Sequence, residues 1–313
     1  MVSKSIQQMS SGSKRVSTKT IGFIGVGLMG HGMAKNIVEK GFPLLVMGHR
    51  NRAPVEDLVG RGATEVKTAR EMAEKADIIH ICVTGSPQVE AVMEGEQGII
   101  AGAKSGLIVI DTSTADPNST LALAEKLATK GAHLVDAPLS RTPKEAEAGT
   151  LDTMVGATPE LFEAVKPVIS TWSTNIVHIG KLGDGHKMKL LNNFIAMGYA
   201  ALYSEALAIA DQVGITPQAF NSVIGTGRMT NGFYETFMKW TLERDESAHR
   251  FAISNGHKDM RYFSAMANEA GAVNPIASAV KNYFAGAEAV GRGDKYVPML
   301  ADYVASLNGR ENT

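Results

Sequence analysis

The stretch Ile21–Ala34 constrains the fold more than any other part of this 313-residue chain. An apolar run, Ile21–Ile24, leads into the spacing G-x-G-x-x-G at Gly25, Gly27 and Gly30, after which a helical pattern begins. In such a unit the first glycine permits a tight turn, the second lets the backbone approach a pyrophosphate, and the third lets the helix pack on the strand. The helix N-terminus then faces the phosphate charge. This context favours a dinucleotide site over a glycine-rich loop without a ligand.

The composition is that of a globular protein, with 44% hydrophobic and 20% charged residues, and the length allows two domains. A formal net charge of -1 gives no reason to expect nucleic acid or an anionic membrane as a partner. Cys82 is the only cysteine, so no intrachain disulfide or cysteine-cluster metal site can form, and a reducing cytoplasm is the expected compartment. No apolar run approaches the roughly 20 residues that span a bilayer.

The chain divides into three parts by pattern. Residues 1–20 are polar and basic, which predicts a disordered tail and not a secretory signal peptide, with organelle targeting as an alternative. Over 21–183 short apolar runs alternate with helical patterns, which is typical of a doubly wound Rossmann-type α/β domain that binds a dinucleotide. Residues 184–313 are helical in pattern, beginning with one long helix over 186–213. We expect this all-α part to serve substrate binding and oligomerisation.

The expected strands form a parallel sheet. They are Ile21–Ile24, Leu44–Met47, Ile78–Val83, Leu107–Ile110, His133–Asp136, Met154–Gly156 and Asn175–Ile179. Helical patterns between them include Val55–Gly60, Pro87–Met93 and Ser119–Thr129. Ligands on such sheets bind beyond the carboxyl ends of the strands. The segments around Thr84, Thr112–Thr114 and Pro138–Thr142 should therefore converge on one crevice.

Several sequence blocks occur in an order that one enzyme family shares. They are Gly25–Asn36, Asp111–Pro117, Asp136–Ser140, Gly185–Asn193 and His257–Asp259. Together they span about residues 21–300 and resemble the β-hydroxyacid dehydrogenase family, a branch of the 6-phosphogluconate dehydrogenase superfamily. That family includes 3-hydroxyisobutyrate dehydrogenases and tartronate semialdehyde reductases. The resemblance implies a C-terminal domain like that of 6-phosphogluconate dehydrogenase and a homodimer or homotetramer.

The resemblance implies hydride transfer between a nicotinamide cofactor and a small anionic β-hydroxy acid or its semialdehyde, such as 3-hydroxyisobutyrate, tartronate semialdehyde or a sulfolactaldehyde-like compound. Oxidation must also remove the hydroxyl proton, and the reverse reaction must protonate an aldehyde oxygen. Lys189 matches the family's catalytic lysine, and partial burial would help its ammonium lose a proton. Asn193 lies four residues later on the same helix face and can hold the substrate or the lysine. These two are the expected catalytic residues.

Two other functions remain open from the sequence. One is a dinucleotide-binding sensor or scaffold of the same fold without this chemistry, and the other is an imine reductase-like activity. The intact Lys189 and Asn193 argue against both. The spacing of His31, Asp184 and His186 does not assemble a metal site, so no metal is expected.

The expected substrate loop departs from the family pattern, which usually reads Ser-Gly-Gly. Here the loop reads Ser140, Arg141 and Thr142, and the resemblance adds Asn192 to the substrate-binding residues. The Arg141 guanidinium supplies a permanent charge and a forked set of donors that suits an oxyanion, as in sulfolactaldehyde reductases. We expect Arg141 to select a substrate with a strongly acidic or doubly anionic end. The alternative is that Arg141 points to solvent or pairs with Glu145.

The end of the second strand predicts the choice of cofactor. NAD-preferring sites place an acid there to accept from the ribose 2′-hydroxyl, whereas a 2′-phosphate requires cationic donors. After Met47 the chain continues through Arg50 and Arg52 with no acid before Glu56. We therefore expect a preference for NADP(H), with NAD(H) possible, and Arg50 as the favoured phosphate contact. The full set of expected cofactor-binding residues is Gly25, Gly27, Leu28, Met29, Gly30, His49, Arg50, Asn51, Val83, Thr84, Thr114 and Lys258.

Overall fold

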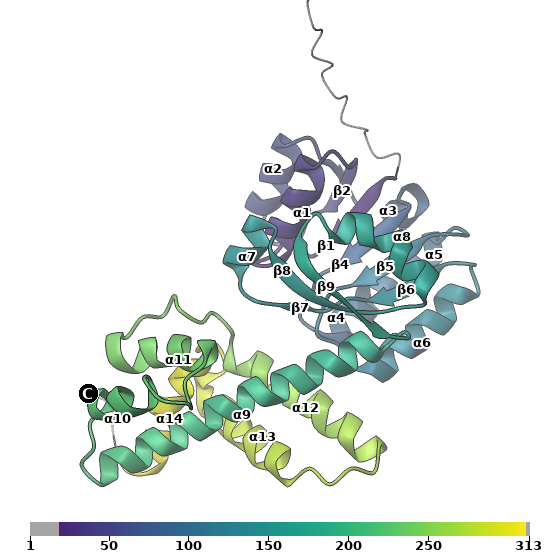
Figure 1. Ribbon diagram of the computed structural model, residues 1–313. Coiled ribbons are helices and arrows are strands. Elements are labelled where there is room, and N and C mark those ends of the chain that lie inside the picture. Colours follow the sequence, from purple (N-terminus) through teal and green to yellow (C-terminus); the bar gives the residue numbers. More distant parts are fainter. Residues whose placement is uncertain (1–18, 311–313) are drawn as a thin grey trace, which may run out of the picture.

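The computed structural model describes residues 19–310 and contains a sheet flanked by helices, followed by a group of helices (Figure 1). The predicted tail therefore lies outside the described residues except for Lys19 and Thr20. The strands are β1 Ile21–Ile24, β2 Leu44–Met47, β3 Thr64–Val66, β4 Ile78–Ile81, β5 Ile108–Asp111, β6 His133–Asp136, β7 Leu139–Ser140, β8 Leu151–Gly156 and β9 Ser173–Gly180. Their order is β3-β2-β1-β4-β5-β6-β8-β7, and β9 pairs with β8.

The sheet is parallel from β3 to β6 and changes direction after β6. β8 runs antiparallel to β6 and to β7, while β9 is parallel to β8. The prediction of a wholly parallel sheet was wrong at this edge. β7 continues in the direction of β6, and the chain reverses between β7 and β8, so that β8 returns antiparallel to both. Two short strands, β3 and β7, were not predicted. β3 has only three residues, two of them exposed, so it shows no apolar run.

Helices cover both faces of the sheet. The flanking helices are α1 Gly30–Glu39, α2 Ala53–Gly60, α3 Ala69–Lys75, α4 Ser86–Met93, α5 Ile99–Gly102, α6 Pro117–Ala128, α7 Pro143–Ala148 and α8 Pro159–Ile169. α1, α2, α7 and α8 contribute to one apolar cluster, and α3 to α6 contribute to another. Met33 and Phe162 belong to the first cluster, whereas Met72 and Leu123 belong to the second. The two clusters account for the doubly wound arrangement.

The rest of the described chain is helical. It comprises α9 Asp184–Gln212, α10 Pro217–Ile224, α11 Gly232–Glu243, α12 Ile253–Glu269, α13 Pro275–Ala287 and α14 Leu300–Leu307. α9 leaves the sheet and runs along the whole helical part, as Figure 1 shows. A third apolar cluster joins α9 to α11, α12, α13 and α14. Among residues 19–310, no helix combines the length and apolar character needed to cross a membrane.

Candidate active site

The glycine-rich turn has the shape that a pyrophosphate requires. Gly25 has φ +95°, and a Cβ there would lie 2.1 Å from the carbonyl oxygen of Cys82. A Cβ on Gly30 would lie 2.0 Å from the carbonyl oxygen of Gly25, so the helix can begin there only with glycine. By contrast, nothing lies within 4 Å of a Cβ on Gly27, which leaves its backbone open to a ligand. These residues fit a dinucleotide at the N-terminus of α1.

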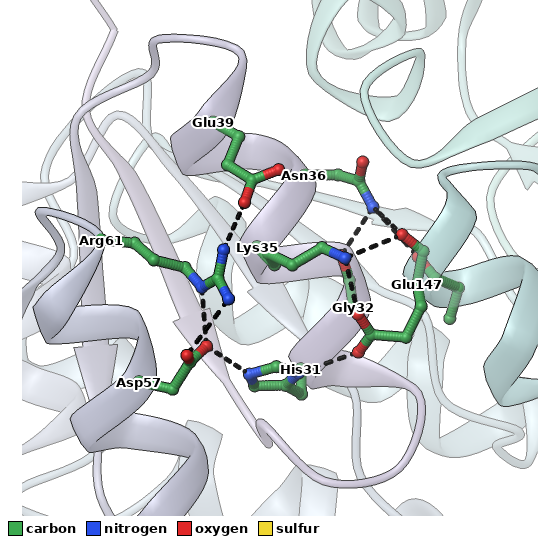
Figure 2. Close-up of polar contacts among 9 residues, drawn as sticks. His31, Gly32, Lys35, Asn36, Glu39, Asp57, Arg61 and Glu147 are labelled. Carbon is green, nitrogen blue, oxygen red and sulfur yellow. Dashed lines mark hydrogen bonds and ion pairs between the residues drawn. The ribbon is translucent and has the colours of Figure 1, made fainter.

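The same helix, α1, holds the segment that follows the expected substrate loop. A Cβ on Gly32 would lie 2.6 Å from the backbone nitrogen of Glu147, so α1 and α7 meet backbone to backbone. Asn36 Nδ2 donates to the carbonyl oxygen of Ala146 at 3.0 Å. Lys35 Nζ donates to the carbonyl oxygen of Glu147, also at 3.0 Å. Figure 2 shows both side chains of α1 reaching α7. The dinucleotide turn and residues 140–142 are thereby fixed to one helix.

His31 extends this contact to α2. Its Nδ1 lies 2.8 Å from Glu147 Oε1 on α7, and its Nε2 lies 2.9 Å from Asp57 Oδ2 on α2. Arg61 also binds Asp57 and Glu39 (Figure 2). His31 therefore belongs to a polar network between helices. No group of three or more His, Cys, Asp or Glu side chains that could hold a metal ion occurs within residues 19–310.

The start of α9 is anchored on the end of β6. Asp136 is fully buried and accepts hydrogen bonds from the backbone nitrogens of Gly183 and His186, each at 2.7 Å. A Cβ on Gly185 would lie 2.5 Å from the carbonyl oxygen of Met154, so this turn of α9 packs against β8 without a side chain. Lys189 comes one turn later. Its position is therefore set directly by the sheet.

Lys189 is half-buried on α9 and lies near the charged side chains of Lys258 and Asp259. Burial is the main reason that its pKa is lowered to about 8. The carboxylate of Asp259 opposes this shift, and the ammonium of Lys258 adds to it. Asn193, which is 6% exposed, donates from Nδ2 to Asp259 Oδ2 at 2.6 Å. Asn192 in turn donates to Asn193 Oδ1 at 3.1 Å.

Lys258 connects α12 to the ends of β4 and β5. Its Nζ donates to the carbonyl oxygens of Thr84 at 2.6 Å and Thr114 at 2.9 Å, and it lies 3.0 Å from Asp259 Oδ1. Beside it, Val83 donates from its backbone nitrogen to Ser113 Oγ at 3.1 Å. The structure thus brings the predicted segments at 83–84 and 112–114 together with Lys258.

Asp259 is the residue that the sequence reading missed. It is 1% exposed and contacts both Lys258 and Asn193. The sequence does show an acid directly after Lys258 in the block His257–Asp259. It does not show that this acid binds Asn193, because Asn193 lies on another helix. His257, by contrast, binds Glu288 through Nδ1 at 2.5 Å and takes no part in this cluster.

The expected substrate loop has an unusual backbone. Arg141 has φ +83°, a left-handed conformation that favours glycine, the residue that the family usually has there. Its Nε donates to Asp152 Oδ2 at 2.8 Å, and Asp152 lies opposite Ser140 in the β7–β8 pair. The alternative pairing with Glu145 does not form a hydrogen bond, because Thr142 holds that carboxylate through its amide and its hydroxyl. Arg141 remains 48% exposed, so solvent or a ligand can reach it.

The residues that follow β2 form an exposed cationic segment. His49, Arg50, Asn51 and Arg52 are all exposed. Within residues 19–310 Arg50 has no ion pair, whereas Arg52 binds Glu65 with both terminal nitrogens, at 2.6 and 2.8 Å. A shallow groove of about 590 Å³ lies beside this segment, with Met47, Lys67 and Val92 among its lining residues. Leu28, exposed at 60%, and Met29, at the N-cap of α1, complete the set of predicted cofactor residues.

Sequence comparisons match the two parts of the chain separately. The profile of the NAD binding domain of 6-phosphogluconate dehydrogenase matches residues 20–180. The profile described as NAD-binding of NADP-dependent 3-hydroxyisobutyrate dehydrogenase matches residues 183–302. Together they show that the chain has the nicotinamide dinucleotide-binding domains of this group of dehydrogenases.

Three relatives illustrate the similarity. The 2-(hydroxymethyl)glutarate dehydrogenase of Eubacterium barkeri is 33% identical over 87% of this chain and 90% of its own. The 3-sulfolactaldehyde reductase of Escherichia coli is 29% identical over 87% of this chain and 91% of its own. A crystal structure of 3-hydroxyisobutyrate dehydrogenase from Salmonella typhimurium has a TM-score of 0.81 at 25% identity, and the match covers 91% of this chain and 99% of that one. The similarity extends over both parts of the chain.

Proposed function

The chain belongs to the β-hydroxyacid dehydrogenase family, and we propose that it uses Lys189 to move a proton during reduction of a dianionic semialdehyde, with NADP(H) as the preferred cofactor. It is an oxidoreductase that transfers hydride between a nicotinamide and a small hydroxy acid or its aldehyde. The single observation that carries the proposal is the lowered pKa of Lys189, about 8, beside Asp259 and Asn193.

The proposed chemistry divides between cofactor and protein. A bound nicotinamide gives a hydride to the aldehyde carbon, or takes one from the hydroxyl-bearing carbon. Lys189 as an ammonium donates a proton to the aldehyde oxygen, and as a free amine it removes that proton from the hydroxyl in the reverse direction. A pKa of about 8 makes both forms available near neutral pH. Asn193 acts through Asp259, whose carboxylate it orients beside Lys189.

The preference for NADP(H) is supported by charge. Arg50 is exposed, has no ion pair within residues 19–310, and follows β2, where a Rossmann-type site receives the ribose 2′ substituent. A free guanidinium there suits a phosphate. The profile matching residues 183–302 is also named for an NADP-dependent enzyme.

The proposed substrate class rests on Arg141. The Nε of Arg141 binds Asp152, which leaves the donors of its two terminal nitrogens for a ligand. One relative is named for hydroxymethylglutarate, which carries two carboxylates, and another for sulfolactaldehyde, whose single anion is a strongly acidic sulfonate. A second anionic group on the substrate would find in Arg141 a forked set of donors. We therefore assign Ser140, Thr142 and Asn192 to the substrate and Arg141 to its second anion.

We propose that the protein is a homo-oligomer joined along α9. Four large apolar side chains on that helix recur every seven residues and are exposed: Met188 at 37%, Ile195 at 55%, Leu202 at 62% and Ile209 at 55%. A seven-residue apolar repeat suits pairing with an equivalent helix. Leu202→Glu would then give a smaller species by sedimentation, and an unchanged species would refute this assembly.

Because Cys82 is the only cysteine, we propose the cytoplasm as the compartment.

The experiment that tests the proposed function is a substrate screen under NADPH and NADH. The compounds are 2-formylglutarate, an aldehyde with two carboxylates, a cyclic imine, and aldehydes with a single anion: glyoxylate, the semialdehydes of succinate, tartronate and methylmalonate, and sulfolactaldehyde. The proposal predicts the highest kcat/KM for a substrate with a second anion, and a higher value with NADPH than with NADH. In Arg141→Ala the KM for that substrate should rise, while KM for glyoxylate should not. Tight NADPH binding without turnover of any compound would favour a sensor instead, and turnover of cyclic imines alone would favour an imine reductase.

A further inference from the structure

The carboxyl end of β2 carries an acidic side chain that comes from the neighbouring strand. Glu65 lies on β3 opposite Val46, and its carboxylate reaches Gly48, the residue that follows β2. A Cβ on Gly48 would lie 2.7 Å from Glu65 Oε1. In Rossmann-type sites an acid at this end of the strand accepts a hydrogen bond from the ribose 2′-hydroxyl of NAD. The acid that the β2 sequence lacks is therefore supplied across the sheet.

Arg52 brings the opposite charge to the same place. Its two terminal nitrogens bind the two oxygens of Glu65 at 2.6 and 2.8 Å. A Cβ on Gly48 would lie 2.0 Å from Arg52 Nη1, so a larger residue there would displace the guanidinium from this position. The guanidinium, with help from the Gly48 amide, holds the pKa of Glu65 below its usual range. The pair thus consists of a carboxylate and a guanidinium that are both charged, and a second carboxylate, Glu56, lies 4.0 Å from Arg52 Nε.

This pair lies where a ligand can reach it. The side chains of Arg52 and Glu65 are 47% and 36% exposed. Met47, directly before Gly48, also lines the shallow groove beside the ends of β2 and β3. An adenine in that groove would place its ribose near the pair. The only other cation of this segment, Arg50, is free to bind a phosphate without breaking an ion pair within residues 19–310.

We propose that Glu65 and Arg52 together determine specificity at the 2′ position of the adenosine ribose, with Glu65 disfavouring a 2′-phosphate and Arg52 favouring it. The inference rests on the proposed binding of a nicotinamide cofactor by this chain. Glu65 repels a 2′-phosphate. To bind Arg52, the phosphate must either share the guanidinium with Glu65 or displace the Glu65 carboxylate from it. A 2′-hydroxyl donates to Glu65 instead, while Arg52 keeps the carboxylate in place. The pair therefore weakens the preference for NADP(H) that Arg50 provides, so that the protein binds both NADP(H) and NAD(H).

Binding to the full chain tests this inference without turnover. Kd is measured for NADPH and NADH, and for adenosine 2′,5′-bisphosphate and 5′-AMP as probes of the 2′ position alone. In Glu65→Gln, which keeps the shape and removes the charge, we expect NADPH to bind about fivefold more tightly and NADH more weakly. In Arg52→Gln we expect the opposite shift. The two adenosine probes should change in the same sense as the two cofactors.

Glu74→Gln serves as the matched control, because Glu74 forms an exposed ion pair with Arg70 on α3 and lies outside the site. It should leave the ratio of the two Kd values unchanged. A ratio that changes by less than about twofold in both Glu65→Gln and Arg52→Gln overturns the inference while leaving the proposed function intact. Failure of both cofactors to bind the unaltered protein overturns both.

Discussion

The Asp259 carboxylate accepts a hydrogen bond from Asn193 Nδ2 at 2.6 Å, and its charge raises the pKa of Lys189 against the effect of burial. This contact joins α12 to the face of α9 that carries the lysine. It ties the proton affinity of Lys189 to a residue of another helix. Asp259 is accordingly a positioning residue whose effect can be separated from that of Lys189.

Asp259→Asn is expected to lower kcat roughly tenfold and to lower the pKa of Lys189 below its value of about 8, because the charge that favours the ammonium is removed. The measurement is the pH profile of kcat/KM for aldehyde reduction. Asp302→Asn is a suitable control, because Asp302 binds Trp240 and Arg244 at a distance in the fold from Lys189. A loss of activity with an unmoved profile would mean that Asp259 has a structural role alone.

The two reaction directions should depend on pH in opposite senses. Reduction needs the Lys189 ammonium, so its kcat/KM should fall as pH rises through about 8. Oxidation needs the free amine, so its kcat/KM should fall as pH decreases through the same value. Initial rates in both directions across this range provide the measurement. If kcat/KM fell with the same direction of pH change in both reactions, Lys189 would be excluded as the group that exchanges the proton.

Arg141→Gly should separate stability from specificity. Glycine accepts the left-handed backbone at φ +83° without strain, so we expect Tm to rise by roughly 2 °C. The same change removes the donors for a second substrate anion, so KM for a dianionic semialdehyde should increase. Arg141→Ala keeps the strain and is the matched control for Tm. An unchanged KM in both variants would show that Arg141 does not contact the substrate.

Stability should decrease in mild acid because His80 is buried as a neutral ring. Burial lowers its pKa to about 3, whereas the unfolded chain has the ordinary value of 6.5. Below pH 6.5 the unfolded state therefore binds one more proton, and the free energy of unfolding falls by up to about 1.4 kcal/mol per pH unit until the folded ring also titrates. Urea unfolding at pH 7 and pH 5 measures the difference in the free energy of unfolding. His80→Gln should reduce the difference, and His133→Gln, at an exposed position, should not.

Local patterns predicted the elements whose residues are close in sequence. The glycine spacing at 25–30 and the apolar runs of β1, β2 and β6 identified the dinucleotide turn and most of the sheet, because each depends on a few consecutive residues. α9 was predicted over nearly its full length for the same reason. Its exposed apolar stripe was not, because periodicity does not show which face a neighbour covers.

Contacts between distant elements could not be predicted in this way. Glu65 reaches the end of β2 from a strand that shows no apolar run. Asp152 lies beside Arg141 because β8 pairs with β7, a strand that was not predicted. In both cases the ion pair depends on strand register. The sequence therefore predicted a role for Arg141 and favoured Arg50 over Arg52, and it did not predict the acids that bind Arg52 and Arg141.

The most direct test of the account compares Lys189→Ala with the unaltered protein in the reduction of a dianionic semialdehyde, with NADPH binding measured in parallel. Loss of the proton donor should lower kcat by at least about a hundredfold while Kd for NADPH stays the same. Lys187→Ala, which removes a neighbouring lysine paired with Asp184, should keep most of the activity. Undiminished turnover in Lys189→Ala would contradict the central claim that this lysine carries the proton.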